Sequence, residues 1–506
     1  MSPEDARTVP ARAEVRETHS AYVILIGDTA YKMKKPVRTA FLDFSSVISR
    51  RHALEREHTL NARFAPDVYR GVGDLTDPSG GPAEPVLWMR RLPDAERLST
   101  LARDRTRELD DDLDAIARQV AGVHTTSRRT ARIDRGGSSD SLAGRWAANL
   151  LEARGDGSCV LDDTMLDEIE SCVETFLGGR AALIDRRIEE GRIVDGHGDL
   201  LADDIFCAAD GPRILDCLDF DDALRFLDGI DDAACLAMDL EFQGRADLAR
   251  QFIRYYRDAA FDLAPPALVH HYIAHRAFVR AKVACIRDRQ GDDEARSDAV
   301  DHARLALDHL HAGTVTLTIV GGLPGTGKTT LATYMAENTD SVVISSDVVR
   351  KSLAGFAPTT SHTADVGRDL YAEEMTHRTY DAMLNRAHAH LAGGHSVVLD
   401  ASWMDPTLRA RAEALAAATR STLVQIECSV PASVALERVS TRTGSASDAT
   451  TEVYRDMARR RRAWPASSTV VTTTDRETAG DAALAHWRLR TNEPVSAMRD
   501  GAGVVG

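Results

Sequence analysis

The sequence has few cysteines and no long apolar run, and each shortage narrows what the chain can be. Its seven cysteines stand at positions 159, 172, 207, 217, 235, 285 and 428 without a Cys-x-x-Cys pair. This pattern is typical of reduced, mostly buried thiols and not of a disulfide or zinc framework. No stretch approaches the roughly 18 continuous apolar residues of a membrane span, and the polar N-terminus lacks the apolar run of a signal peptide. We therefore expect a cytoplasmic protein with no membrane partner.

The sequence also has fewer positively than negatively charged residues. It contains 62 Lys and Arg and 78 Asp and Glu, which gives a formal net charge of −16. Such a balance opposes long-range attraction to nucleic acid or anionic lipid, so nucleic acid is not an expected partner. At 506 residues the chain is too long for one core, since domains usually hold roughly 100–200 residues. Two domains are expected, and the first can be bilobal.

The pattern of strand and helix signals in the sequence changes after Gly313. Five apolar, β-type runs then alternate with helical patterns, at 314–320, 341–345, 396–400, 422–428 and 469–473. Strand–helix alternation predicts an α/β domain with a doubly wound parallel sheet. We place the domains at 1–312 and 313–490, followed by a flexible tail at 491–506.

A phosphate-binding loop of the Walker A type joins the first of these strands to a helix. It comprises Gly322, Leu323, Pro324, Gly325, Thr326, Gly327, Lys328, Thr329 and Thr330. The glycines let backbone N–H groups turn towards phosphate oxygens, and the helix N-terminus adds its positive dipole end. Lys328 is expected on the β- and γ-phosphates of ATP, and the Thr329 hydroxyl on Mg²⁺.

Two carboxylates and an arginine follow the next strands. Asp347 can accept the proton of an acceptor hydroxyl, and Arg350, one turn later, can hold the acceptor or its phosphate. The alternative is an Asp N-cap with an exposed Arg. Asp400 closes a hydrophobic run as a Walker B carboxylate does and would act through the Mg²⁺ shell; the alternative is a strand-end Asp in a turn. Arg438 and Arg442 lie on one helical face, as lid arginines over the nucleotide or as a solvated surface.

These segments, in this order, resemble the small P-loop kinases related to gluconate kinase and to the kinase domain of polynucleotide kinase. The resemblance spans about 314–490 and implies phosphoryl transfer from ATP to a hydroxyl, with Asp347 as general base and Arg350 as acceptor ligand.

The N-terminal part has a second constellation, in which the β run RIVD leads into HGDL and a later run leads into LDFD. Asp199 of the first motif would orient or deprotonate an acceptor hydroxyl, while Asp204 and Asp219 would bind Mg²⁺. Lys32, on an early strand, would contact the phosphates and pair with Glu57 on a helix. Three other acidic clusters, at 110–112, 231–232 and 292–293, are most simply solvated helix faces or caps.

These residues resemble the aminoglycoside phosphotransferase and choline kinase group over about 15–290, including the form fused to a P-loop kinase domain. The resemblance implies an α+β, protein-kinase-like bilobal fold. The sequence departs from that group at Asp204, where the family usually has Asn, and at Leu201, where it often has a polar residue.

The sequence thus predicts an ATP- and Mg²⁺-dependent phosphotransferase with two nucleotide sites, acting on a hydroxyl of a small molecule such as a sugar or an aminoglycoside. Two alternatives stay open. The N-terminal half can be a pseudokinase that regulates the C-terminal kinase, or the protein can be a polynucleotide 5′-hydroxyl kinase or a nucleotide-sugar kinase of the zeta-toxin kind.

Overall fold

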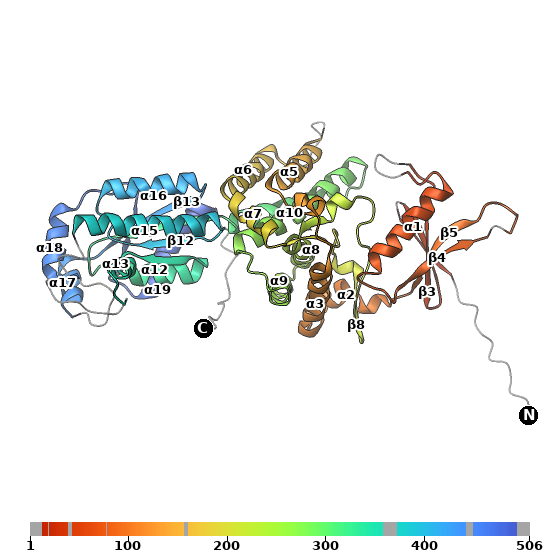
Figure 1. Cartoon of the computed structure of the whole chain (residues 1–506), viewed down its shortest axis with the longest axis horizontal. Coiled ribbons are helices and arrows are strands. Elements are labelled where there is room, and N and C mark those ends of the chain that lie inside the picture. The colour runs from red at the N-terminus through yellow and green to blue at the C-terminus, as the bar shows by residue number, and fades with distance from the viewer. Residues whose placement is uncertain are drawn as a thin grey trace, which may run out of the picture. The chain divides into compact units, whose positions relative to one another are not determined.

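The computed structural model describes residues 13–18, 20–38, 43–76, 78–155, 160–357, 372–441 and 449–492 (Figure 1). The chain divides into two compact units. The first contains residues 1–142 and 187–264, and the second contains residues 143–186 and 265–506. Among the described residues, no helix combines the length and the apolar character that crossing a membrane requires.

The first unit begins with a five-stranded antiparallel sheet in the order β1-β2-β3-β5-β4. Its strands are β1 (Glu14–Glu17), β2 (Ala21–Ile26), β3 (Thr29–Lys34), β4 (Tyr69–Leu75) and β5 (Glu84–Arg90). Helix α1 (Val47–Asn61) packs against β4 and β5 and is capped by Ser46, whose side chain accepts a hydrogen bond from the Ser49 amide. Leu54 of α1 and Leu87 of β5 are fully buried between helix and sheet.

Helices and two short antiparallel strand pairs form the rest of this unit. The helices are α2 (Leu98–Arg103), α3 (Asp110–Thr126), α4 (Ala131–Gly136), α8 (Gly229–Phe242) and α9 (Ala246–Ala260). The strand pairs are β6 (Ile193–Asp195) with β9 (Phe226–Asp228), and β7 (Ile205–Ala208) with β8 (Gly211–Ile214). A small sheet with one packed helix, followed by a helical part with a central hairpin, is the kinase-like bilobal fold that the sequence predicts.

The second unit contains a five-stranded parallel sheet in the order β11-β12-β10-β13-β14. Its strands are β10 (Thr316–Gly321), β11 (Val342–Ser345), β12 (Val397–Asp400), β13 (Thr422–Ser429) and β14 (Ser468–Val471). Helices α12 (Lys328–Thr339) and α19 (Arg476–Thr491) pack together on one face, and α15 (Glu373–Ala392) and α16 (Pro406–Ala418) cover the other (Figure 1). The predicted doubly wound parallel sheet is confirmed.

Four long helices also belong to the second unit: α5 (Ser139–Arg154), most of which lies in it, α6 (Asp163–Gly179), α10 (Pro266–Arg289) and α11 (Ala295–Ala312). Helices α10 and α11 therefore belong to the same compact unit as the parallel sheet, although the strand–helix alternation of the sequence begins only after Gly313. Of the predicted tail, Thr491 is the last residue of α19 and Asn492 its C-cap; residues 493–506 lie outside the described part of the chain.

Candidate active sites

The loop between β10 and α12 has the backbone that a phosphate-binding loop needs. Gly322, Gly325 and Gly327 have φ angles of +136°, +79° and +85°, a region that side chains other than glycine rarely adopt. A Cβ atom on Gly322 would also lie 2.6 Å from the carbonyl oxygen of Cys428. The loop conformation therefore depends on glycine at these positions.

Lys328 and Thr329 stand at the first turn of α12, directly after this loop. Lys328 Nζ donates a 2.9 Å hydrogen bond to the Leu323 carbonyl, so its side chain folds back across the loop. Thr329 Oγ1 donates a 2.7 Å hydrogen bond to Asp400 Oδ2. Asp400 lies level with Val320 in the sheet, at the carboxyl end of the neighbouring strand. The three predicted residues are thus brought together at one edge of the sheet.

Asp400 is almost fully buried, with 3% of its surface exposed. Burial raises its pKa, while the charge of Lys328 and the hydrogen bond from Thr329 act in the opposite direction. A hydroxyl and a carboxylate side by side are hard oxygen donors of the kind that Mg²⁺ binds, and this ion usually keeps several waters and needs only one or two protein ligands. Thr329 and Asp400 therefore fit a magnesium ion.

Asp347 and Arg350 lie on α13 (Ser346–Leu353), which begins at the end of β11. Arg350 Nη1 donates a 2.9 Å hydrogen bond to Asp347 Oδ1. The N-cap of this helix is Ser345, and Arg350 is buried, with 7% exposed. The alternative of an Asp N-cap with an exposed Arg is therefore wrong. The hydrogen bond holds Asp347 and Arg350 in one geometry at the end of β11.

The arginine segment expected to close over the nucleotide is described only in part. Arg438, on α17 (Ala432–Thr441), donates a 3.0 Å hydrogen bond from Nη2 to the Thr472 carbonyl. The Thr472 hydroxyl in turn donates to the Thr326 carbonyl of the P-loop, at 2.5 Å. Arg442 lies outside the described residues. Thr472 carries no motif that would have revealed its contact with the loop.

In the first unit, two lysines of β3 share one buried glutamate. Lys32 Nζ lies 2.7 Å from Glu57 Oε1, and Lys34 Nζ lies 2.8 Å from Glu57 Oε2. Burial acts to raise the pKa of Glu57, but the two lysine charges outweigh it and hold the pKa below its ordinary value. The structure brings the predicted Lys32–Glu57 pair together and adds Lys34, which the period-2 geometry of a strand places on the same face.

Asp216 is a residue that sequence reasoning missed. It follows β8 with a φ angle of +62°, unusual for a residue other than glycine, and its Oδ1 lies 3.2 Å from Lys32 Nζ. Asp219 instead lies 3.4 Å from Lys34 Nζ. The segment has aspartates at both positions, and only the fold distinguishes their lysine partners.

The carboxylates of Asp199 and Asp216 influence the ionisation of Asp204. Burial and the charges of Asp216 and Asp199 raise its pKa to about 8. Like charges that raise a pKa in this way are relieved by a bound cation. However, within the described parts of the chain, no three His, Cys, Asp or Glu side chains are close enough to form a ready metal cluster.

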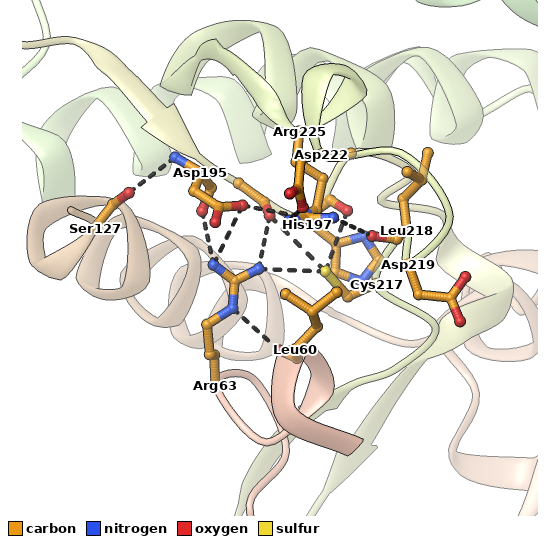
Figure 2. Close-up of polar contacts among 12 residues, drawn as sticks. Leu60, Arg63, Ser127, Asp195, His197, Cys217, Leu218, Asp219, Asp222 and Arg225 are labelled. Atoms are coloured by element: carbon orange, nitrogen blue, oxygen red, sulfur yellow. Dashed lines mark hydrogen bonds and ion pairs between the residues drawn. The ribbon is translucent and has the colours of Figure 1, made fainter. Parts of the chain in front are cut away.

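Two arginines hold the segment that leads to Asp199 (Figure 2). Arg63 donates 2.9 Å hydrogen bonds to the carbonyl oxygens of Asp195 and Gly196. Arg225 donates from Nε to Asp195 Oδ1 and from Nη1 to the Leu218 carbonyl, both at 2.8 Å. The strand end before Asp199 is thereby tied to the segment that carries Asp219.

A buried aspartate anchors the turn that leads to Asp199. Asp232 accepts hydrogen bonds from the amides of His197 (2.6 Å) and Gly198 (2.8 Å), and its carboxylate lies 2.9 Å from His124 Nε2. It is fully buried. The interpretation of Asp231 and Asp232 as a solvated cluster is therefore wrong, because the N-terminal part of α8 lies in the interior, beneath the turn that presents Asp199.

Comparison with known proteins places the whole chain. It is 45% identical over 475 residues to uncharacterized protein Rv2004c of Mycobacterium tuberculosis and, equally, to uncharacterized protein Mb2027c of Mycobacterium bovis; the matches cover 94% of this chain and 95% of each relative. The chain belongs to the Rv2004c family. Within this family member, residues 317–464 match the family described as AAA domain.

Shorter and structural likenesses concern the separate halves of this Rv2004c family member. A segment of 44 residues is 52% identical to mevalonate-3-phosphate 5-kinase of Thermoplasma acidophilum, covering 8% of this chain and 22% of that protein. A gluconokinase from Sinorhizobium meliloti aligns with a TM-score of 0.27 at 18% identity, covering 35% of this chain and 94% of the other. A choline/ethanolamine kinase family protein from Mesorhizobium loti aligns with a TM-score of 0.37 at 17% identity, covering 60% and 92%. The fold assignment rests on the strand orders and packing described above.

Proposed function

We propose that the protein is a cytoplasmic, ATP- and Mg²⁺-dependent phosphotransferase that acts on a hydroxyl of a small molecule, with one nucleotide site in each half. The observation that carries the proposal is the meeting of the P-loop, the Thr329–Asp400 hydrogen bond and the Asp347–Arg350 pair around the carboxyl ends of β10, β12 and β11. Ligands of open α/β sheets bind outside this edge of the strands.

In the C-terminal half, the loop amides and Lys328 would hold the ATP phosphates, and Thr329 and Asp400 would hold the magnesium ion. A magnesium ion held by these two residues would supply positive charge that neutralises the phosphates. Asp347 would accept the proton of the acceptor hydroxyl, and Arg350 would orient both Asp347 and the acceptor. Because transfer depends mainly on positioning and charge, the buried, hydrogen-bonded state of Arg350 supports this role.

In the N-terminal half, Lys32 would contact the phosphates while Glu57 holds it in place. Asp199 would orient or deprotonate the acceptor hydroxyl. Asp204 and either Asp216 or Asp219 would bind Mg²⁺, and the proximity of Asp216 to Lys32 and its effect on the pKa of Asp204 support Asp216 in this pair. Burial is the main cause of the raised pKa of Asp204, and the charges of Asp216 and Asp199 add to it.

The nature of the acceptor is inferred from chemistry. Net charge of −16 argues against a nucleic-acid acceptor, and the local similarity to mevalonate-3-phosphate 5-kinase supports a small metabolite. None of the six described cysteines forms a disulfide, which agrees with a reducing compartment. A sugar or an aminoglycoside-like polyol fits a site that recognises hydroxyl groups.

The test is ATP consumption by the full chain with a panel of sugars, aminoglycosides, nucleosides and short oligonucleotides, for wild type, Lys328→Ala and Asp199→Ala. We expect one acceptor to stimulate turnover that Lys328→Ala abolishes, and another that Asp199→Ala abolishes. If Asp199→Ala leaves every turnover unchanged, the N-terminal half is a regulatory pseudokinase. If no acceptor stimulates hydrolysis by wild type, the proposal is wrong for both halves.

A further inference from the structure

A cavity of about 190 Å³ lies in the second unit, away from the P-loop. Its lining includes Val315, directly before β10, and Thr422, the first residue of β13. The P-loop follows the other end of β10, which has six residues, or about 20 Å of extended chain. The cavity therefore opens at the amino ends of the strands, whereas the proposed ATP site lies at their carboxyl ends.

The charge of the lining is unusual for so acidic a protein. Arg180, Arg420 and Arg490 line the cavity, together with His309 and His311. None of the described residues in the lining is Asp or Glu. Outside the lining, Glu168 Oε1 lies 3.0 Å from Nε2 of His311. A cavity with three guanidinium groups and no carboxylate is complementary to an anion.

Arg180 is the decisive residue, because it is buried and forms no ion pair with an Asp or Glu in the described part of the chain. Only 1% of it is exposed. Its Nη1 donates to the carbonyl of Thr419 (2.7 Å) and its Nη2 to the hydroxyl of Ser421 (3.2 Å). Its buried Nε has no hydrogen-bond partner among the described residues. Burial lowers its pKa to about 10, so the guanidinium is still charged at neutral pH. A buried charge with an unused donor is costly unless a ligand pairs with it.

Hydroxyl donors complete a set suited to phosphate oxygens. Thr422 and Thr491 line the cavity beside the arginines, and Arg420 and Arg490 are exposed. Planar guanidinium groups bind phosphate through two parallel hydrogen bonds, and the hydroxyls can donate to the remaining oxygens. The volume is below the roughly 300 Å³ at which pockets for drug-sized ligands begin, which favours a small ligand.

We propose that this cavity is a binding site for a small phosphorylated metabolite, separate from both nucleotide sites. Arg180 is the buried anchor, and the exposed Arg420 and Arg490 are the outer contacts. The proposal does not depend on the assigned phosphotransferase activity, since it concerns the opposite edge of the sheet.

The experiment is calorimetric titration of inorganic phosphate and of pyrophosphate into the full chain. A non-hydrolysable ATP analogue with Mg²⁺ is present at saturation, so that the nucleotide sites are occupied. The variants are Arg180→Gln and Arg490→Gln. The matched control is Arg488→Gln, which removes the same charge from the same exposed part of α19 without touching the cavity lining.

We expect pyrophosphate to bind wild type and the Arg488→Gln variant equally. Loss of one charged hydrogen-bonding partner should weaken binding roughly tenfold or more in Arg180→Gln and Arg490→Gln. Circular dichroism shows whether Arg180→Gln folds; if it does not, Arg490→Gln alone decides. Absence of binding to wild type, or equal weakening by Arg488→Gln and Arg490→Gln, overturns the proposal.

Discussion

Thr329 and Asp400 are joined by a 2.7 Å hydrogen bond from Oγ1 to Oδ2, across 71 residues of sequence. The contact connects the helix after the P-loop with the end of the adjacent strand. It places a hydroxyl and a buried carboxylate where a metal ion bound to nucleotide phosphates would sit. The pair is therefore the natural point at which to test the C-terminal site.

Replacing Thr329 separates metal binding from folding. Thr329→Val keeps the size of the side chain but removes the hydroxyl, so we expect ATP turnover in the C-terminal site to fall about 10–100-fold and to require more Mg²⁺. Thr329→Ser, which keeps the hydroxyl, is the control and should retain activity. The measurement is turnover against Mg²⁺ concentration. Equal loss in both variants would contradict a metal-binding role.

Asp347 is predicted to act on the proton of the acceptor and not on ATP binding. Asp347→Asn preserves an oxygen acceptor for Arg350 but is a poor base, so we expect kcat to fall by about 10²–10⁴. The KM for ATP should stay close to that of wild type. Steady-state kinetics with the acceptor found in the panel measure both. A rise in the KM for ATP with unchanged kcat would place Asp347 in nucleotide binding instead.

Lys32 and Lys34 should differ in role although both contact Glu57. The side chain of Lys32 is 17% exposed and also contacts Asp216, whereas that of Lys34 is 6% exposed. We expect Lys32→Met to weaken binding of an ATP analogue to the N-terminal half about tenfold. We expect Lys34→Met chiefly to lower the melting temperature, since it leaves buried carboxylates with less positive charge.

Titration in a Lys328→Ala background isolates the N-terminal nucleotide site for this comparison, and thermal unfolding measures stability. If Lys34→Met removes nucleotide binding and Lys32→Met spares it, the assignment of the phosphate-contacting lysine passes to Lys34.

Acid should weaken the first unit through a buried ion cluster. Arg187 binds Asp228 and Asp262, each at 2.6 Å, and all three are buried. Burial acts to raise the pKa of Asp262, but Arg187 outweighs it and holds the pKa below the ordinary 3.8. Because this pKa is depressed in the folded state, the ionised Asp262 stabilises the fold above pH 3.8, and this stabilisation is lost as the pH falls below that value.

The free energy of unfolding should therefore decline as the pH falls below about 4, more steeply in wild type than in Asp262→Asn. Arg187→Met removes the positive charge that faces two buried carboxylates and should cost about 3–5 kcal/mol at neutral pH. Urea unfolding followed at several pH values measures both effects. Identical pH slopes in wild type and Asp262→Asn would show that Asp262 does not carry this dependence.

The sequence by itself determined the local parts of this protein. The P-loop could be recognised because its glycines, Lys328 and Thr329 lie within one short segment. A few neighbouring residues therefore determine the backbone conformation of the loop. The parallel sheet could be predicted because apolar β-type runs alternate with helical patterns. Asp199 and the pairing of Lys32 with Glu57 followed from a resemblance to known motifs.

Only the tertiary structure decided which distant side chains meet. Asp216 contacts Lys32 across 184 residues, and no feature of its own segment distinguishes it from Asp219. Asp232 lies in an acidic stretch that the sequence suggests is solvated, but in the fold it is buried beneath the turn that leads to Asp199. Arg180 likewise donates hydrogen bonds to Thr419 and Ser421, which lie more than 230 residues away in the sequence. Burial removes water from such groups, and burial is set by packing between segments that the linear sequence does not place side by side.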